Sequence, residues 1–237
     1  MRFGVLVFPG TWSDRDCYHA VRDGLGEQAD FLWHKDTAVD SFDCLILPGG
    51  FSYGDYLRVG AIARFSPVMK SVVEFAKAGR PVIGICNGFQ ILCEAGLLPG
   101  VLMKNSHLQF RCEWAHIRVE NNRTPFTNQA KFGQVLTMPV SHGDGNYHVD
   151  VKTLANMEEA GQVVFRYCDE EGEISTQHNP NGSLSHIAGV TNPRGNVLGM
   201  MPHPERAADV LLGGDDGLVV MGSLVEFVNS APSLRAE

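Results

Sequence analysis

Short apolar runs alternate along the first part of this chain with stretches whose apolar residues recur at helical spacing. Strands are predicted for four of the short runs, at residues 3–8, 30–34, 44–47 and 81–85. Helices are predicted for residues 14–25, where apolar positions lie four apart, and 66–78, which opens with Ser-Pro and is followed by glycine. This alternation of strands and helices predicts a mostly parallel sheet covered by helices on both faces.

The second part of the chain is less regular. Residues 107–140 are expected to include antiparallel strands, and three later strands are predicted at residues 162–167, 187–191 and 196–201. A closing helix is predicted for residues 217–229. The segment 169–185 is polar and rich in Gly, Asn and Ser, which predicts a surface loop. Because no repeat, linker or second core is visible, residues 1–237 are expected to form a single domain.

Composition narrows the function classes. The net charge of −8 without a Lys/Arg run argues against nucleic acid as the main partner. No apolar stretch approaches the roughly 18 residues of a membrane span, and the amino terminus carries no signal-peptide pattern, so we expect a cytoplasmic protein that does not bind membranes. The six cysteines form no C-x-x-C pair, and no cluster has metal-ligand spacing. No phosphate-binding loop is present, so ATP would have to bind another polypeptide.

The segment from Gly84 to Gln90 is the most informative in the sequence. It forms a G-x-C-x-G turn directly after a predicted buried strand and directly before a predicted helix, the context of a nucleophile elbow. Gly84 and Gly88 leave room for a turn that exposes Cys86 at the carboxyl edge of the sheet. There the helix amino terminus favours a thiolate, and the Asn87 N–H can donate to a developing oxyanion.

A cysteine nucleophile needs a histidine base and a group that orients it, and two pairs qualify. His203 and Glu205 follow a predicted strand, and the prolines around His203 favour an extended path that places residues i and i+2 on one side. His142 and Asp144 have the same spacing. The prolines favour the first pair, but spacing alone leaves both open.

A second oxyanion donor is predicted in the glycine pair that follows the strand at residues 44–47. Consecutive glycines let a backbone N–H point into a site without a side chain in the way. The Gly50 N–H is therefore the candidate partner of the Asn87 N–H. The alternative is an ordinary glycine-rich turn.

Taken together, these motifs resemble the class I, or triad, glutamine amidotransferases. The resemblance rests on Gly84–Gln90, on Pro48–Arg58 and on Met200–Arg206, which contains His203-Pro204-Glu205. It implies a flavodoxin-like sheet in which Cys86 is the nucleophile, His203 the base and Glu205 its orienting carboxylate. It further implies that Gln90 contacts bound glutamine, and that Ser141, His142 and Gly143 line the glutamine pocket.

The resemblance also implies a place in a larger enzyme. The chain matches free-standing glutaminase subunits that deliver ammonia to a separate synthetase subunit, with a small accessory subunit completing the complex. No cofactor is then expected on this chain, whereas ATP and Mg²⁺ are expected on the synthetase, which converts formylglycinamide ribonucleotide to formylglycinamidine ribonucleotide in purine biosynthesis. The chain departs from the usual pattern at Thr11-Trp12-Ser13, where Ser-Asn-Cys is common, and in the length of the loop 169–185.

Three alternatives remain beside this interpretation. The chain could be the glutaminase subunit of another amidotransferase, or a cysteine hydrolase with a similar elbow on a flavodoxin-like sheet. Such hydrolases lack a late His-Pro-Glu, which this chain has at residues 203–205. A regulatory module that kept only the fold is the third, and the intact candidate triad argues against it.

Overall fold

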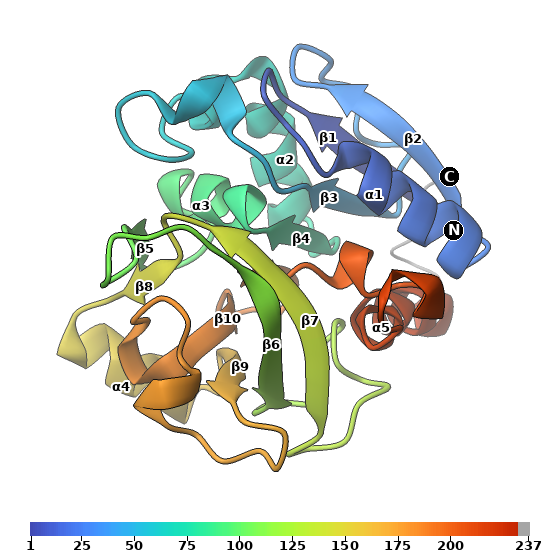
Figure 1. Ribbon diagram of the computed structural model, residues 1–237. Coiled ribbons are helices and arrows are strands. Elements are labelled where there is room, and N and C mark those ends of the chain that lie inside the picture. Colours follow the sequence, from blue (N-terminus) through green and yellow to red (C-terminus); the bar gives the residue numbers. More distant parts are fainter. Residues whose placement is uncertain (232–237) are drawn as a thin grey trace.

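A nine-stranded mixed sheet lies at the centre of the protein, whose computed structural model describes residues 1–231 (Figure 1). Its strands are β1 (Arg2–Val7), β2 (Gln28–Trp33), β3 (Cys44–Leu47), β4 (Val82–Ile85), β6 (Arg111–Val119), β7 (Val135–His142), β9 (Val163–Cys168), β10 (Ile187–Thr191) and β11 (Val197–Met200). They are ordered β2-β1-β3-β4-β11-β10-β9-β6-β7. A separate two-stranded sheet pairs β5 (Val101–Met103) with β8 (Asn146–His148).

The sheet has a parallel half and an antiparallel half. Strands β2, β1, β3, β4 and β11 all run in one direction, and β10, β9, β6 and β7 continue the sheet by antiparallel pairing. The expected antiparallel strands within residues 107–140 are confirmed as β6 and β7, which place Arg111 opposite His142. Strand β7 extends two residues further than expected, to His142.

Five α-helices connect and cover these strands: α1 (Asp14–His19), α2 (Pro67–Lys77), α3 (Asn87–Glu94), α4 (Val151–Glu159) and α5 (Gly217–Ser230). Because β2 and β4 lie on opposite sides of the β1–β3 pair, right-handed crossovers place α1 and α2 on opposite faces of the sheet (Figure 1). The helix predicted over residues 14–25 is shorter than expected, because α1 ends at His19 and the chain widens into a π-helical turn over Ala20–Gly24.

The parallel strands position the functional residues. Every side chain of β3, β4 and β11 is buried, as expected for strands covered on both faces. Their carboxyl ends lead into Pro48-Gly49-Gly50, into Cys86 and into the segment that carries His203, so three separate motifs meet at one edge of the sheet.

The mostly parallel α/β architecture is therefore confirmed. The single-domain prediction for residues 1–237 stays a prediction, and its last six residues, 232–237, lie outside the described ones. Within residues 1–231, no helix is long and apolar enough to cross a lipid bilayer.

Candidate active site

Cys86 occupies a strained turn between β4 and α3. Its backbone has φ 51° and ψ −105°, a conformation rare for a residue with a side chain, and such strain clusters at functional sites. A Cβ on Gly84 would lie 2.5 Å from Leu92 Cδ1, and one on Gly88 would lie 1.9 Å from the Leu47 carbonyl oxygen. The elbow predicted from the G-x-C-x-G spacing is confirmed, because both glycines are required by close packing.

The thiol of Cys86 is 5% exposed and lies at the amino terminus of the eight-residue helix α3. Its Sγ donates a hydrogen bond to the carbonyl oxygen of Ser141, with an S···O distance of 3.6 Å. The oriented N–H groups of the first helical turn favour negative charge on sulfur. The geometry therefore suits a nucleophilic thiolate.

His203 and Glu205 form a buried pair. The chain is extended at His203, with φ −103° and ψ 90°, and the His203 N–H donates to the Pro139 carbonyl oxygen at 2.8 Å. His203 Nδ1 lies 2.6 Å from Glu205 Oε1, and both side chains are about 2% exposed. The predicted pairing is thus present. The extended path ends earlier than expected, because Glu205 already belongs to a 3₁₀ turn over Pro204–Arg206.

The imidazole of His203 also faces the thiol of Cys86. A Cβ placed on Gly49 would lie 2.7 Å from His203 Cε1 and 3.4 Å from Cys86 Cβ, so ring and cysteine border the same gap. Nε2 is buried and makes no regular hydrogen bond within residues 1–231, which is common in catalytic pairs before substrate binds. Burial lowers the pKa of His203, but the Glu205 carboxylate and the Cys86 thiol outweigh it and raise that pKa to about 10.

His142, the alternative base, lies in a different environment. Its Nε2 is 3.0 Å from the side-chain amide nitrogen of Asn181, and no hydrogen bond among the described residues joins it to the Asp144 carboxylate. Burial, together with the nearby His203 and His107, lowers the pKa of His142 to about 3. A neutral imidazole with so low a pKa accepts a proton poorly, so the structure favours His203 as the base.

The two predicted oxyanion donors belong to the turns that follow β3 and β4: Gly50 comes directly after Gly49, and Asn87 directly after Cys86. Gly50 has φ +148°, and a Cβ there would lie 2.5 Å from the Trp12 backbone nitrogen. The Gly49 carbonyl accepts from the N–H groups of Trp12 and Ser13, which fixes the turn. Among the hydrogen bonds of residues 1–231, none uses the N–H of Gly50 or of Asn87. Both N–H groups are therefore free for a substrate oxygen, and their role stays a prediction.

Gln90 connects helix α3 to the segment 141–145. Its side-chain oxygen accepts from Asn87 Nδ2 at 2.8 Å, and its nitrogen donates to the Asp144 carbonyl at 2.7 Å. Ser141 meets the Cys86 thiol through its carbonyl, as described above. Ser141, and with it the segment that continues through His142 and Gly143, therefore lies beside the nucleophile and forms a wall there. Contact of these residues with glutamine stays a prediction.

A cavity of about 320 Å³ opens onto the histidine side of this site, at the small end of the usual range for ligand pockets. It is lined by Trp12, Ser13, Gly50, Phe51, Phe110, Cys112, Ser141, His203 and Arg206. No group of three His, Cys, Asp or Glu side chains within residues 1–231 is arranged to hold a metal ion. The chemistry available here is acyl transfer through a thiol.

Sequence reasoning missed several residues that hold this site together. Arg206 donates to Ser13 Oγ at 3.0 Å and to the Asp16 carboxylate at 3.1 Å, which ties the cavity to α1. Asn105 and Asn181 both contact His142 in the wall segment. Asn105 Nδ2 donates to the His142 carbonyl at 2.9 Å, and the amide nitrogen of Asn181 lies 3.0 Å from His142 Nε2. Of these residues, only Arg206 could have been suspected from the sequence, because it directly follows Glu205, the candidate orienting carboxylate.

The loop 169–185 is only partly the surface loop that its composition predicts. Asn181 is fully buried, and its amide nitrogen lies within 3.1 Å of both His142 Nε2 and the Tyr167 hydroxyl. Ser183 is also buried and donates through its hydroxyl to the Gly145 carbonyl at 3.1 Å. The end of this loop therefore supports the wall of the candidate pocket.

Fold and site together define a cysteine-dependent amidotransferase, and comparison with known proteins agrees. Residues 1–212 match the model of the CobB/CobQ-like glutamine amidotransferase domain. This chain belongs to the glutamine amidotransferase family, which confirms the resemblance noted in its motifs.

Particular relatives narrow the assignment. The chain is 58% identical over 236 residues to the phosphoribosylformylglycinamidine synthase subunit PurQ of Moorella thermoacetica, with 100% of both chains covered. It is 55% identical to the corresponding subunit of Thermomicrobium roseum, over 95% of each chain. A chain in the structure of PurLQS from Thermotoga maritima matches with a TM-score of 0.85 and 42% identity, covering 96% of this chain and 98% of that one.

A more distant glutamine amidotransferase from Thermotoga maritima matches with a TM-score of 0.55 and 15% identity. It covers 98% of this chain and 84% of that one, and it shows the fold alone.

Proposed function

We propose that this chain is the glutaminase subunit of a phosphoribosylformylglycinamidine synthase. The observation that carries the proposal is the convergence of Cys86 with the His203–Glu205 pair around Gly49. That arrangement supports glutamine hydrolysis, and the 58% identity to a PurQ subunit over the whole chain supports this particular enzyme. In that assignment, the ammonia released here converts formylglycinamide ribonucleotide to formylglycinamidine ribonucleotide in purine biosynthesis.

The reaction proceeds through a thioester. The Cys86 thiolate attacks the side-chain amide carbon of glutamine, and the N–H groups of Gly50 and Asn87 stabilise the oxyanion that forms on the carbonyl oxygen. Protonated His203 gives its proton to the amide nitrogen, the C–N bond breaks, and ammonia leaves. His203 then removes a proton from water, whose oxygen attacks the thioester carbon and releases glutamate and the thiol.

Glu205 keeps the imidazole in the tautomer and orientation that both steps need. Its carboxylate lies 2.6 Å from Nδ1, so this nitrogen carries a proton while Nε2 exchanges protons with the reacting groups. The pKa of His203, raised to about 10, belongs to the state in which ring, carboxylate and thiol lie together. Such a ring is protonated at neutral pH and is ready to donate to the leaving nitrogen.

Partner subunits complete the enzyme in this proposal. Three aromatic side chains near the cavity, Trp12, Phe51 and Phe110, are 67%, 41% and 51% exposed and pack against one another. Exposed apolar clusters of this kind are typical of protein interfaces. We assign this face to the synthetase subunit, which binds ATP and Mg²⁺, with a small accessory subunit in the same complex. This chain binds no cofactor of its own in that arrangement.

The complex is expected in the cytoplasm. All six cysteines of the chain are free thiols, as is usual in a reducing compartment. Neither nucleic acid nor a membrane is a partner in this assignment, in keeping with the net charge of −8.

Replacement of the nucleophile tests the proposal. In the reconstituted complex, we expect Cys86→Ala to abolish glutamine-dependent product formation while ammonia-dependent synthesis continues at the wild-type rate. The matched control is Cys93→Ala, since Cys93 lies on the same helix away from the elbow. Equal loss of both activities in Cys86→Ala would contradict a role confined to glutamine hydrolysis.

Glutamate release by the purified chain, measured with and without the other two subunits, tests the assignment to a complex. Strong stimulation by the partners is expected. High activity that is indifferent to them would identify an independent amidase instead.

A further inference from the structure

The side chain of Asn87 is buried beside the nucleophile, and the function proposed above uses only the backbone N–H of this residue. It is 2% exposed and lies in the first turn of α3, directly after Cys86. Its oxygen accepts from the Ser52 backbone N–H at 3.1 Å, and its nitrogen donates to Gln90 Oε1 at 2.8 Å. Asp55 Oδ1 lies 3.5 Å from the same nitrogen, at the limit of a hydrogen bond. Both ends of the amide are therefore engaged.

The chemistry of its partners fixes the orientation of this amide. A backbone N–H can only donate, so the oxygen of Asn87 has to face Ser52. The nitrogen of Asn87 then faces Gln90, whose own nitrogen donates to the Asp144 carbonyl at 2.7 Å. A directed series of hydrogen bonds thus runs from the loop after β3, through two side chains of α3, to the wall of the candidate pocket.

These hydrogen bonds join the two turns that carry the candidate oxyanion donors. Ser52 is two residues after Gly50, so its bond to Asn87 brings the Gly50 turn against the elbow. Among residues 1–231, every side-chain hydrogen bond between the loop 48–57 and the elbow at residues 84–90 is made by Asn87. The placement of one donor turn relative to the other therefore depends on this amide.

The loop after β3 is strained and needs such contacts to keep its shape. Positive φ values of 55°, 53° and 72° occur at Tyr53, Asp55 and Leu57, in the left-handed region that side chains rarely occupy. Strain of this kind persists only where the surrounding structure holds it, and it clusters at active sites. The Tyr53 hydroxyl, 2.9 Å from His34 Nδ1, holds the loop on one side, and Asn87 holds it on the side of the nucleophile.

We propose that the side chain of Asn87 is a positioning residue for glutamine hydrolysis, which sets the oxyanion hole by clamping the loop after β3 to the elbow. This inference rests on the proposed function, because it concerns a step of that reaction. The amide holds the Gly50 N–H in place relative to the N–H of Asn87 itself. Because the oxyanion exists only in the tetrahedral state, the clamp contributes to that state and not to the binding of glutamine.

Asn87→Ala in the reconstituted complex tests this proposal. The kcat for glutamine hydrolysis is expected to fall about 10–100-fold, less than the roughly 10²–10³-fold lost when an oxyanion donor is deleted outright. The KM should change by less than about threefold, because the lost interaction acts in the transition state.

Alkylation of Cys86 by iodoacetamide, followed by mass spectrometry of the cysteine peptide, gives an independent readout on the purified chain. In this reaction the thiolate displaces iodide from carbon, and no oxyanion forms. The alkylation rate of Asn87→Ala should therefore stay within about twofold of the wild type. A side chain that only supported the fold would change both reactions together.

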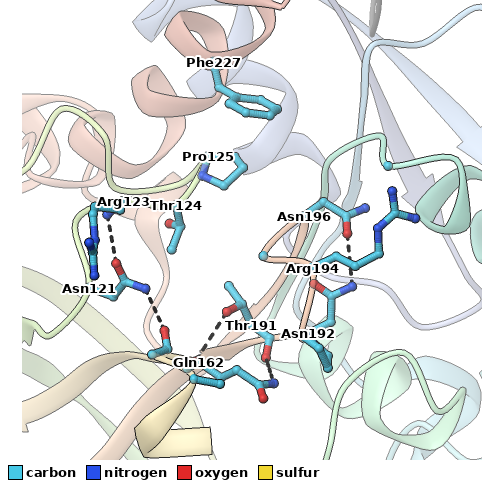
Figure 2. Close-up of a pocket in the computed structure, with 15 residues that line it drawn as sticks. Asn121, Arg123, Thr124, Pro125, Gln162, Thr191, Asn192, Arg194, Asn196 and Phe227 are labelled. Atoms are coloured by element: carbon cyan, nitrogen blue, oxygen red, sulfur yellow. Dashed lines mark hydrogen bonds between the residues drawn. The ribbon is translucent and has the colours of Figure 1, made fainter.

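Asn196→Ala is the matched control, because Asn196 is also a buried asparagine with several side-chain hydrogen bonds. It precedes β11, at the edge of the sheet away from the candidate active site, and its oxygen accepts from Asn192 at 3.1 Å (Figure 2). Its nitrogen donates to the carbonyls of Ala76 and Arg80. Both variants should lose stability in urea denaturation, and only Asn87→Ala should lose kcat.

Each of three results would overturn the proposal. They are a kcat of Asn87→Ala within about twofold of that of Asn196→Ala, a KM that rises as much as kcat falls, and a loss of alkylation parallel to the loss of hydrolysis. A wild-type complex that hydrolyses no glutamine would refute the proposed function itself. Unaffected hydrolysis in Asn87→Ala beside an active wild type would refute the positioning role alone.

Discussion

Gly49 offers a sharp test of how the candidate triad is assembled, because it lies where a single added methyl group would separate nucleophile from base. A Cβ at this position would lie 2.7 Å from His203 Cε1, 3.2 Å from Ser13 Oγ and 3.4 Å from Cys86 Cβ. The backbone of Gly49 does not have a positive φ, so alanine is compatible with it. The effect of Gly49→Ala should therefore arise from contacts of the new methyl group alone.

The size of the effect follows from these distances. Carbon atoms in good contact lie about 3.5–4.0 Å apart, so the imidazole has to retreat by about 1 Å. The ring has little freedom to move, because Nδ1 is held by the Glu205 carboxylate and the backbone N–H of His203 is held by the Pro139 carbonyl. A displacement of about 1 Å costs about 10²-fold in rate. We expect kcat for glutamine hydrolysis to fall by this factor, with about 1–3 kcal/mol lost from the free energy of unfolding.

Steady-state glutamate release by the reconstituted complex measures this prediction, and urea denaturation of the chain measures the loss of stability. Gly214→Ala is the matched control, since its Cβ would meet Trp114 only at 3.9 Å and its φ is not positive. Ammonia-dependent synthesis should be unaffected in both variants. A Gly49→Ala enzyme with kcat within twofold of the wild type would refute the placement of His203 beside Cys86.

Two further predictions concern the partners of the histidines. Because the pKa of His203 is raised to about 10, protonation of this ring stabilises the folded state fully below pH 6.5 and the contribution is lost as the pH rises toward 10. Glu205→Gln removes much of this stabilisation, because the Glu205 carboxylate is the main group that raises the pKa of His203. The difference in unfolding free energy between wild type and variant, measured by urea denaturation, should therefore narrow as the pH rises from 6.5 toward 10. A difference that stays constant would contradict the reasoning. Asn181→Ala removes the amide that holds His142 and the Tyr167 hydroxyl, so the KM for glutamine should rise about tenfold while kcat changes less. An unchanged KM would show that the wall does not depend on Asn181, and Asn179→Ala in the same loop controls for general loosening.

The nucleophile was predictable from the sequence because its geometry is set locally. Gly84 and Gly88 flank Cys86 within five residues, and each is required by contacts to elements adjacent in the sheet or the following helix. The pairing of His203 with Glu205 was predictable for a similar reason, since Pro202 and Pro204 restrict the backbone on both sides of His203. The prediction was wrong in one local detail, the extended path through Glu205. A 3₁₀ turn begins at Pro204 instead, and it still brings the Glu205 carboxylate to His203 Nδ1.

The choice between His203 and His142 could not be made from spacing, because it depends on long-range contacts. Both histidines precede a carboxylate by two residues. The packing of β7 against neighbouring loops buries His142 and places its ring within hydrogen-bond distance of Asn181, 39 residues further along the chain. No local pattern encodes that contact. The prolines favour His203 without deciding the choice, and among the sequence features only the resemblance to a family decides it.

Asn181 illustrates why polar composition misled the prediction for the loop 169–185. Runs of Asn, Gly and Ser are typical of exposed loops because burial of an unpaired amide costs about 1–3 kcal/mol. Here the amide nitrogen meets His142 and the Tyr167 hydroxyl, while its oxygen accepts from the backbone N–H of Ser183. The cost of burial is thus offset only when β7, β9 and the loop end are all in place. No local sequence pattern can predict the burial of a residue that depends on three separate segments. The contribution of Asn181 to the wall of the pocket could therefore be found only from the fold.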